Sequence, residues 1–298
     1  MKTLIIIVTY NAMPWIDRCL SSVKEWDIFV VDNGSTDGTQ QYIAEHYPEV
    51  IFRQSETNLG FGKANNIGLQ YALDHGYDFV YLLNQDAWVF PGTIKKLMEQ
   101  SRLHPEYGIL SPVHIQGNMQ HLDFVFGPCC CSYHTNKALV EDMYFGRPLQ
   151  EAYEVEFVSA AHWLIPRACL KAVGGFSPAF PHYGEDNNYL HRATYMGLKT
   201  VVIPSVRAVH DRENRAPSVK KDMYMRNYIV PLIWLSNINE KKKCSRAISS
   251  LKAMIKNAVK YGSFAPIVYT IKLLSQYRRI VRCAKESRVG GAFLSIPA

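Results

Sequence analysis

Several features that would place this chain in a known class of protein directly are missing from its 298 residues. Its seven cysteines contain no C-x-x-C pair, and the adjacent run Cys129–Cys131 cannot comfortably share one metal ion, which disfavours a zinc site and a disulfide framework. We expect the cysteines to be buried thiols. No apolar run approaches the roughly 18 residues of a transmembrane helix, and the N-terminus enters a strand pattern without a cleavage-site signature. These absences predict a cytoplasmic protein or one bound peripherally to a membrane.

Two phosphate-binding motifs are also missing. No G-x-x-x-x-G-K-[ST] sequence occurs, which disfavours a P-loop NTPase. Gly60-x-Gly62-x-x-Asn65 lacks the third glycine of the dinucleotide fingerprint and follows the third strand pattern, not the first. A hydride-transfer enzyme is therefore disfavoured as well.

Acidic residues are scarce in the last quarter of the chain. Residues 220–298 hold 16 Lys and Arg against 3 Asp and Glu, a net charge of +13, which leaves −6 for residues 1–219. We predict a domain of residues 1–219 and a basic helical extension of residues 220–298. The apolar residues of the extension recur at helical spacing, which suits either an anionic membrane surface or packing on the first domain. No nucleic-acid-binding module accompanies the charge, so we predict no nucleic-acid partner.

The first half of the chain has the pattern of an α/β fold. Short β-branched runs alternate with apolar residues at helical spacing, and the four runs are Leu4–Val8, Ile28–Val31, Val50–Arg53 and Phe79–Leu83. Strands separated by helices predict βαβ units, and hence a mostly parallel sheet flanked by helices. Further strand-like runs occur at Ile109–Val113, Phe124–Phe126, Val155–Ile165 and Val201–Pro204.

Polar clusters follow the predicted strands. They comprise residues 9–11, 32–39, 58–66 and 84–86. Because the carboxyl ends of parallel strands meet at one edge of a sheet, we expect these clusters to converge on one ligand-binding crevice. For residues 32–39 an ordinary Asn-Gly and Asp-Gly turn before a helix is an equal alternative.

Asp86 is the last of three polar residues that follow the predicted buried strand Phe79–Leu83, before a Pro91-Gly92 turn. A carboxylate in this position can hold a hard divalent cation against the phosphates of a substrate. By itself, however, an Asp after a strand is more commonly a turn or helix-cap residue.

Four motifs together resemble the family 2 inverting glycosyltransferases of the GT-A fold, and most of all the rhamnosyltransferase-type enzymes of bacterial polysaccharide assembly. The motifs are Val-Thr-Tyr-Asn at 8–11, Val-Val-Asp-Asn-Gly-Ser-Thr-Asp-Gly-Thr at 30–39, Asn-Leu-Gly-Phe-Gly-Lys-Ala-Asn-Asn-Ile-Gly at 58–68 and Leu-Leu-Asn-Gln-Asp at 82–86. The resemblance implies that Tyr10 lies against the nucleobase of a nucleotide-sugar and that Asp32 hydrogen-bonds the base or ribose. It also implies that Asn65 or Asn66 lies near the nucleotide. The other candidate donor-binding residues are Thr9, Asn11, Asn33, Asn84 and Gln85.

The resemblance makes Asp86 the metal-binding end of the family's D-x-D motif. Here Asn84 replaces the first Asp of that motif. An amide still accepts a hydrogen bond from a hydroxyl, but it supplies no second carboxylate to a cation. We therefore predict dependence on Mn²⁺ or Mg²⁺, with weaker metal affinity.

A further motif, in addition to the four above, begins at Gly174-Gly175-Phe176 and ends at Glu185-Asp186, where a helix is predicted to start. Carboxylates in the first turn of a helix are often only dipole complements. The stretch resembles the family segment whose Asp is the catalytic base, which makes Asp186 the base and Glu185 the residue that orients it or the acceptor. Ser177 and Asn188 replace acidic residues that are frequent in the family, which leaves the acceptor contacts open.

His210 follows Asp186 by 24 residues, a separation that resembles family members in which a His completes the metal site. A lone His near a strand end is more often structural. We take His210 as the second metal ligand, and Arg212 and Arg215 as alternative groups that neutralise a leaving diphosphate.

The sequence thus predicts an inverting glycosyltransferase. The resemblance implies a dTDP-, UDP- or GDP-linked donor, with rhamnose among the candidate sugars, and a saccharide or lipid-linked saccharide acceptor at the inner face of the plasma membrane. The alternatives are a catalytically inactive nucleotide-sugar-binding partner in a membrane assembly complex, which the Asn84 substitution suggests, and a nucleotidyltransferase with a similar sheet.

Overall fold

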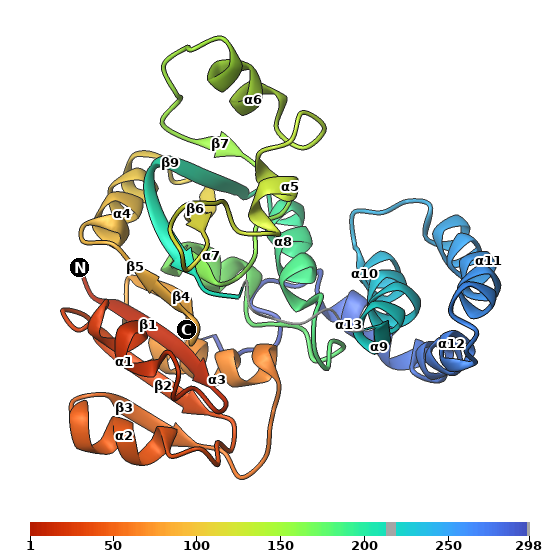
Figure 1. Ribbon diagram of the computed structural model, residues 1–298, viewed down its shortest axis with the longest axis horizontal. Helices are drawn as coiled ribbons and strands as arrows, with labels where there is room; N and C mark the ends of the chain where they lie inside the picture. Colours follow the sequence, from red (N-terminus) through yellow and green to blue (C-terminus); the bar gives the residue numbers. More distant parts are fainter. Residues whose placement is uncertain (213–218, 297–298) are drawn as a thin grey trace.

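The computed structural model describes residues 1–212 and 219–296, so the predicted role of Arg215 lies outside the described residues. It confirms a mixed α/β fold with a central, mostly parallel sheet (Figure 1). The strand order is β3-β2-β1-β4-β8-β6-β9-β5, and β7 pairs with β9. The strands are β1 (Thr3–Thr9), β2 (Asp27–Asp32), β3 (Ile51–Gln54), β4 (Phe79–Asn84), β5 (Ala87–Val89), β6 (Tyr107–Ile115), β7 (Tyr153–Glu154), β8 (His162–Pro166) and β9 (Lys199–His210).

Strands β1, β2 and β4 read as continuous apolar runs because both of their faces are buried. In β1, Leu4 and Ile6 pack into one core while Ile5 and Ile7 pack into the other, and β2 and β4 alternate in the same way. Parallel pairing aligns Thr9 with Asp32. It also aligns Val8 with Asn84. The polar residues that follow β1, β2 and β4 therefore reach the same edge of the sheet, at the point where the strand order changes direction.

Helices cover both faces of the sheet (Figure 1). The first core receives the apolar sides of α3, α7 and α8, and the second receives those of α1, α2 and α4. We call residues 1–212 the catalytic half, because they include the predicted catalytic residues. Its helices are α1 (Ile16–Ser21), α2 (Thr39–His46), α3 (Phe61–Asp74), α4 (Thr93–Leu103), α5 (Phe126–Cys130), α6 (Lys137–Tyr144), α7 (Arg167–Val173) and α8 (Glu185–Tyr195).

The prediction of strand structure at Phe124–Phe126 is wrong. This segment leads into helix α5, because Asp123 Oδ1 accepts hydrogen bonds from the backbone N–H groups of Val125 and Phe126 at 2.9 and 3.0 Å. Such contacts satisfy the unpaired donors at a helix start. The predicted strand at 155–165 is also shorter than expected, since β8 begins only at His162.

The C-terminal part of the chain is helical. It consists of α9 (Val219–Tyr224), a π-helical stretch η1 (Met225–Ile229), α10 (Val230–Ser236), α11 (Lys243–Tyr261), α12 (Ala265–Ser275) and α13 (Tyr277–Glu286). Tyr228 and Leu232 share a small core with Phe180 from the catalytic half and Ile280 from α13. None of the described helices combines the length and apolarity needed to cross a bilayer. The division at residue 219 stays a prediction.

Candidate active site

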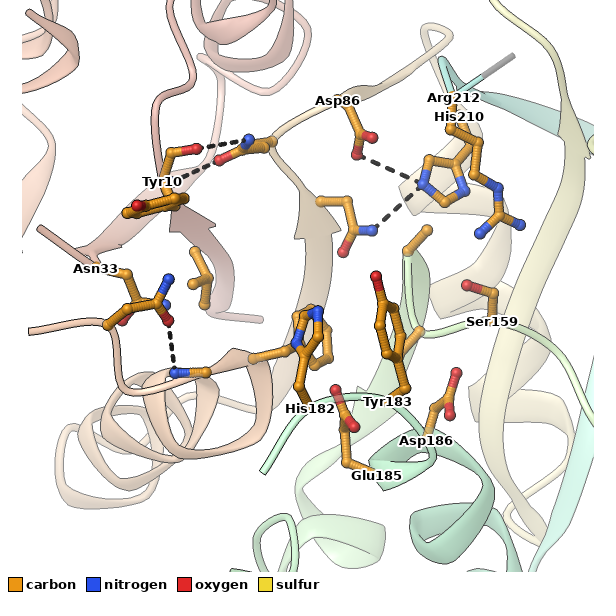
Figure 2. A pocket seen from close by; sticks show the side chains of 18 of the residues that line it. Tyr10, Asn33, Asp86, Ser159, His182, Tyr183, Glu185, Asp186, His210 and Arg212 are labelled. Carbon is orange, nitrogen blue, oxygen red and sulfur yellow. Dashed lines mark hydrogen bonds and ion pairs between the residues drawn. The ribbon is translucent and has the colours of Figure 1, made fainter. Parts of the chain in front are cut away.

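A cavity of about 580 Å³ opens at the carboxyl ends of β1 and β4 and is bounded by the start of α8 and the end of β9 (Figure 2). Eight of the thirteen predicted site residues line it. They are Tyr10, Asn33, Asn84, Gln85, Asp86, Glu185, Asp186 and His210. Among the described residues, the other five, Thr9, Asn11, Asp32, Asn65 and Asn66, lie outside the lining.

Tyr10 lines the cavity, and hydrogen bonds to its backbone hold it in place. The side-chain amide of Gln85 clamps that backbone, with Oε1 accepting from Tyr10 N at 2.6 Å and Nε2 donating to Tyr10 O at 3.1 Å. The Tyr10 ring itself remains 48% exposed. An exposed ring on a fixed backbone can stack on a planar ligand. The role of Gln85 that the geometry supports is to hold Tyr10.

Asp32 is completely buried under the loop that follows β2. Its carboxylate accepts hydrogen bonds from Thr9 Oγ1 at 2.7 Å, from Ser35 N at 2.8 Å and from Gln40 Nε2 at 3.1 Å. Burial would raise the pKa of Asp32, but these hydrogen bonds hold it below its usual value. Asp32 therefore orders the loop, and direct contact with a nucleotide stays a prediction.

Asn65 and Asn66 are engaged with backbone groups. Asn65 Nδ2 donates to Phe61 O at 3.0 Å, within α3. The amide of Asn66 pairs with both backbone groups of Phe176, accepting at 2.6 Å and donating at 2.9 Å. In this structure Asn66 joins α3 to the loop that precedes α8, the helix that carries Glu185 and Asp186.

The glycines of the 58–68 motif allow that loop to approach. A Cβ atom on Gly60 would lie 2.6 Å from the carbonyl oxygen of Pro181, and one on Gly62 would lie 2.9 Å from Cβ of Phe176. Gly60 also has a φ of +79°, which side-chain-bearing residues rarely adopt. The motif thus sets the distance between the side of the cavity that holds Tyr10 and its acidic side.

Asp86 and His210 come together across the pairing of β5 with β9, in which Ala87 opposes His210. His210 Nε2 lies 3.4 Å from Asp86 Oδ1 and 3.3 Å from Asn84 Nδ2 (Figure 2). Both Asp86 and His210 are 1% exposed. A carboxylate and an imidazole placed side by side in a cavity wall are a donor set that suits Mn²⁺ and accommodates Mg²⁺.

Asp123 is a site residue that the sequence interpretation missed. Its Oδ2 faces the other nitrogen of His210, with 3.7 Å between Oδ2 and Nδ1, and also accepts from Arg212 Nε at 2.6 Å. Burial would raise the pKa of Asp123, but the Arg212 hydrogen bonds and charge hold it below its usual value. At 3.7 Å this contact is longer than a hydrogen bond, and Nδ1 of His210 has no hydrogen-bond partner among the described residues, so Asp123 acts on the ring through its negative charge. No sequence motif marks Asp123, because it comes near His210 only through the folding of the 116–126 loop.

A second grouping shares His210. Ligand-type atoms of His114, Asp123 and His210 lie within 4.8 Å of one another. However, His114 Nε2 is already 2.8 Å from Ser111 Oγ, and Asp123 is occupied by Arg212 and by the start of α5. Within the described part of the chain, neither His114 nor Asp123 lines the cavity. We therefore take Asp86 and His210 as the pair that faces a ligand.

Glu185 and Asp186 form the first turn of α8, directly after Gly184, and both line the cavity below the Asp86–His210 pair (Figure 2). Burial, reinforced by the neighbouring Asp186 charge, raises the pKa of Glu185 to about 8. Burial also raises the pKa of Asp186. Glu185 Oε2 has no hydrogen-bond partner among the described residues. A carboxylate of raised basicity in a cavity wall is suited to proton transfer.

The sequence comparisons decide the family. The model of glycosyl transferase family 2 matches residues 4–170, more than half of the chain, and this range includes the carboxyl ends of β1, β2 and β4. The chain belongs to glycosyl transferase family 2. This glycosyltransferase is 27% identical over 241 residues to the N-acetylglucosaminyl-diphospho-decaprenol L-rhamnosyltransferase of Mycobacterium tuberculosis, covering 70% of this chain and 75% of that protein.

Solved structures agree on the fold. The S. aureus TarS fragment 1-349 in complex with UDP-GlcNAc aligns with a TM-score of 0.60 at 19% identity, over 97% of this chain and 84% of that one. The mannosyltransferase PcManGT from Pyrobaculum calidifontis, solved with GDP-Man and Mn²⁺, aligns with a TM-score of 0.56 at 16% identity, over 96% of this chain and 86% of that one. The glycosyltransferase thus has the GT-A fold that the resemblance of its motifs predicted.

The raised pKa of Glu185 predicts a pH-dependent stability cost. When the pKa of a carboxyl group is higher in the folded than in the unfolded state, the free energy of unfolding of the protein falls as pH rises. The fall extends from the unfolded pKa, about 4.3 for Glu, to the folded pKa. The folded pKa of Glu185 is about 8. Glu185→Gln cannot ionise, so it should be more stable than the parent by an amount that grows over this range, on the order of a few kcal/mol. Denaturant unfolding at a series of pH values measures this. A stability difference that does not change with pH would contradict the assignment.

Proposed function

We propose that the protein is a metal-dependent, inverting glycosyltransferase that transfers a sugar from a nucleoside-diphosphate donor to a lipid-linked saccharide. One observation carries the proposal. The Asp86–His210 pair and the Glu185–Asp186 pair face the same cavity, which opens at the strand ends of a family 2 domain. A cation site and a base on opposite walls are what displacement of a nucleoside diphosphate by a hydroxyl group requires.

The metal site would be formed by Asp86 and His210. Their oxygen and nitrogen atoms lie 3.4 Å apart and face the cavity, and Asp123 supports His210 from behind. Only two protein ligands are available in this proposal, because Asn84 stands where a second carboxylate is usual. A bound Mn²⁺ or Mg²⁺ supplies charge stabilisation to the departing nucleoside diphosphate. Arg212, which also lines the cavity, adds positive charge on the same side.

Asp186 would act as the general base. Its carboxylate takes the proton of the acceptor hydroxyl group while the hydroxyl oxygen bonds to the anomeric carbon from the face opposite the diphosphate. The bond between the anomeric carbon and the diphosphate oxygen breaks, and the nucleoside diphosphate keeps the electron pair. This displacement inverts the configuration of the anomeric carbon. Glu185 lies beside Asp186 and is suited to orient the acceptor.

The donor and acceptor classes rest on the relatives. The mycobacterial relative is named for transfer of L-rhamnose to a saccharide on a prenyl diphosphate, which supports rhamnose as a candidate sugar and a lipid-linked acceptor. The solved neighbours hold UDP-GlcNAc and GDP-Man, which supports UDP- and GDP-linked donors as candidates for this chain; a dTDP-linked donor stays a candidate through the motif resemblance alone. Peripheral association with a membrane would bring the enzyme to such an acceptor.

Thermal unfolding in the presence of donors tests the proposal. One class of UDP-, dTDP- or GDP-sugar should raise the melting temperature, more with Mn²⁺ than without. A ligand at about 100 times its Kd stabilises the folded state by roughly 2.7 kcal/mol. Release of free nucleotide from that donor should then exceed background. Stabilisation without any release would favour an inactive nucleotide-sugar-binding protein instead.

Asp186→Asn tests the base. The amide cannot accept the proton, so the transfer rate should fall by roughly 10²–10⁴-fold while the melting-temperature shift caused by the donor stays as in the parent. Steady-state transfer and the donor-dependent thermal shift are measured on the same preparation. Retention of most of the transfer rate with normal donor binding would show that another group is the base.

His210→Ala and Asp123→Asn test the metal site by Mn²⁺ binding, followed through the electron paramagnetic resonance of the free ion. Loss of a partner behind a ligand typically costs 10–100-fold in metal affinity, so we expect roughly that loss for Asp123→Asn and a larger one for His210→Ala. His104→Ala, on the surface between α4 and β6, is the control. Circular dichroism checks that the variants fold. Parental Mn²⁺ affinity in a folded His210→Ala variant would exclude His210 as a ligand.

A further inference from the structure

Two helices of the C-terminal part form an arm that extends away from the sheet (Figure 1). We call α11 (Lys243–Tyr261) and α12 (Ala265–Ser275) the α11–α12 arm. These helices pack mainly against each other and against α10 and η1, whereas α13 and the segment around Phe293 lie against the catalytic half. The sequence left open whether the basic helices bury their apolar faces on the first domain. For α10 and α13 they do, and for the arm a large apolar surface stays uncovered.

The uncovered surface is regular. Its apolar side chains recur every three or four residues along each helix, so within each helix they share one face, and Phe264 adds one more in the turn between the helices. Their exposed fractions range from 40% for Leu251 to 81% for Phe264. The set comprises Ile248, Leu251, Ile255, Val259, Phe264, Val268, Ile271 and Leu274. Exposed apolar surface of this extent and regularity marks an interaction site.

Positive charge borders this surface. Lys252, Lys256 and Lys260 follow one another at four-residue spacing on α11, next to the apolar stripe, and all three are exposed. Residues 241–285 contain twelve Lys and Arg and no Asp or Glu. An occupant of the surface must therefore offer both apolar groups and negative charge.

We infer that the α11–α12 arm docks on an anionic phospholipid surface, with its apolar side chains in the headgroup region and its lysines on the lipid phosphates. The arm would lie in the plane of the interface, since no described helix can cross a bilayer. A second copy of the chain is a poorer occupant, because pairing two such arms would oppose cations without any carboxylate between them. Nucleic acid would match the charge but would leave the apolar stripe uncovered. The inference rests on the arm alone, but it also gives the proposed function access to a lipid-linked acceptor.

Co-sedimentation of the full chain with vesicles tests the inference. The protein should pellet with phosphatidylcholine vesicles that contain phosphatidylglycerol, pellet less as salt is raised, and stay in solution with pure phosphatidylcholine. Replacing Lys252, Lys256 and Lys260 together by Gln should weaken binding roughly 100-fold, at about fivefold per charge. The variant carrying Val259→Ser and Phe264→Ser should also lose binding.

Two matched controls come from the catalytic half. Leu103→Ser with Met143→Ser removes two side chains that are 61% and 62% exposed, and Gln in place of Lys24, Lys95 and Lys171 removes three exposed charges. Both controls should bind vesicles as the parent does. The vesicle assay contains no sugar donor, and the arm variants should keep the parental Mn²⁺ affinity and donor-dependent thermal shift. A failure of the membrane inference can therefore be distinguished from a failure of the proposed function.

Three outcomes would overturn the inference. The first is absence of parental binding to the anionic vesicles at low salt. The second is parental binding that both arm variants retain. The third is a dimer in light scattering that Val259→Ser with Phe264→Ser dissociates, which would assign the arm to a second copy of the chain.

Discussion

The antiparallel pairing of β5 with β9 is the constraint on which the site depends. Ala87 opposes His210 in this pairing, and Asp211 N donates to Asp86 O at 2.8 Å. These backbone contacts join positions more than 120 residues apart in the sequence and leave the side chains of Asp86 and His210 on the same side of the sheet edge. Because the backbone hydrogen bonds fix the register of the two strands, the register also fixes the distance between these two side chains.

The acidic side of the cavity depends on a different contact. The loop before α8 lies against Gly60 and Gly62 and is held by the amide of Asn66. This packing keeps Glu185 buried, which raises its pKa and works against the folded state above the unfolded pKa of the group. A carboxyl pair that lowers stability and faces a cavity is typical of a site retained for chemistry rather than for folding.

The basic C-terminal extension consists of two parts that differ in their packing. The apolar sides of α10 and α13 are buried on the catalytic half, so this part of the extension is anchored. The α11–α12 arm presents cations and apolar side chains outward. The same basic composition therefore accompanies buried apolar faces in one part of the segment and exposed ones in the other, and only the packing tells the two parts apart.

Local pattern by itself determined the first four strands and the helices between them, because the strands are short runs rich in apolar residues and the apolar residues of amphipathic helices recur every three to four positions. It also determined the candidate chemistry, since the motifs that end at Asn11, Asp86 and Asp186 recur in one family in one order. Tertiary structure decided which polar groups are available to a ligand. The side chains of Asp32 and Asn66 are hydrogen-bonded within the protein, whereas Tyr10 and Asn33 face the cavity. Asp123 comes close to His210 through a loop that carries no sequence motif. It also turned the segment after Asp123 into a helix and left the α11–α12 arm uncovered. The availability of a polar atom and the burial of an apolar face depend on residues distant in the chain, and sequence spacing along one segment does not contain them.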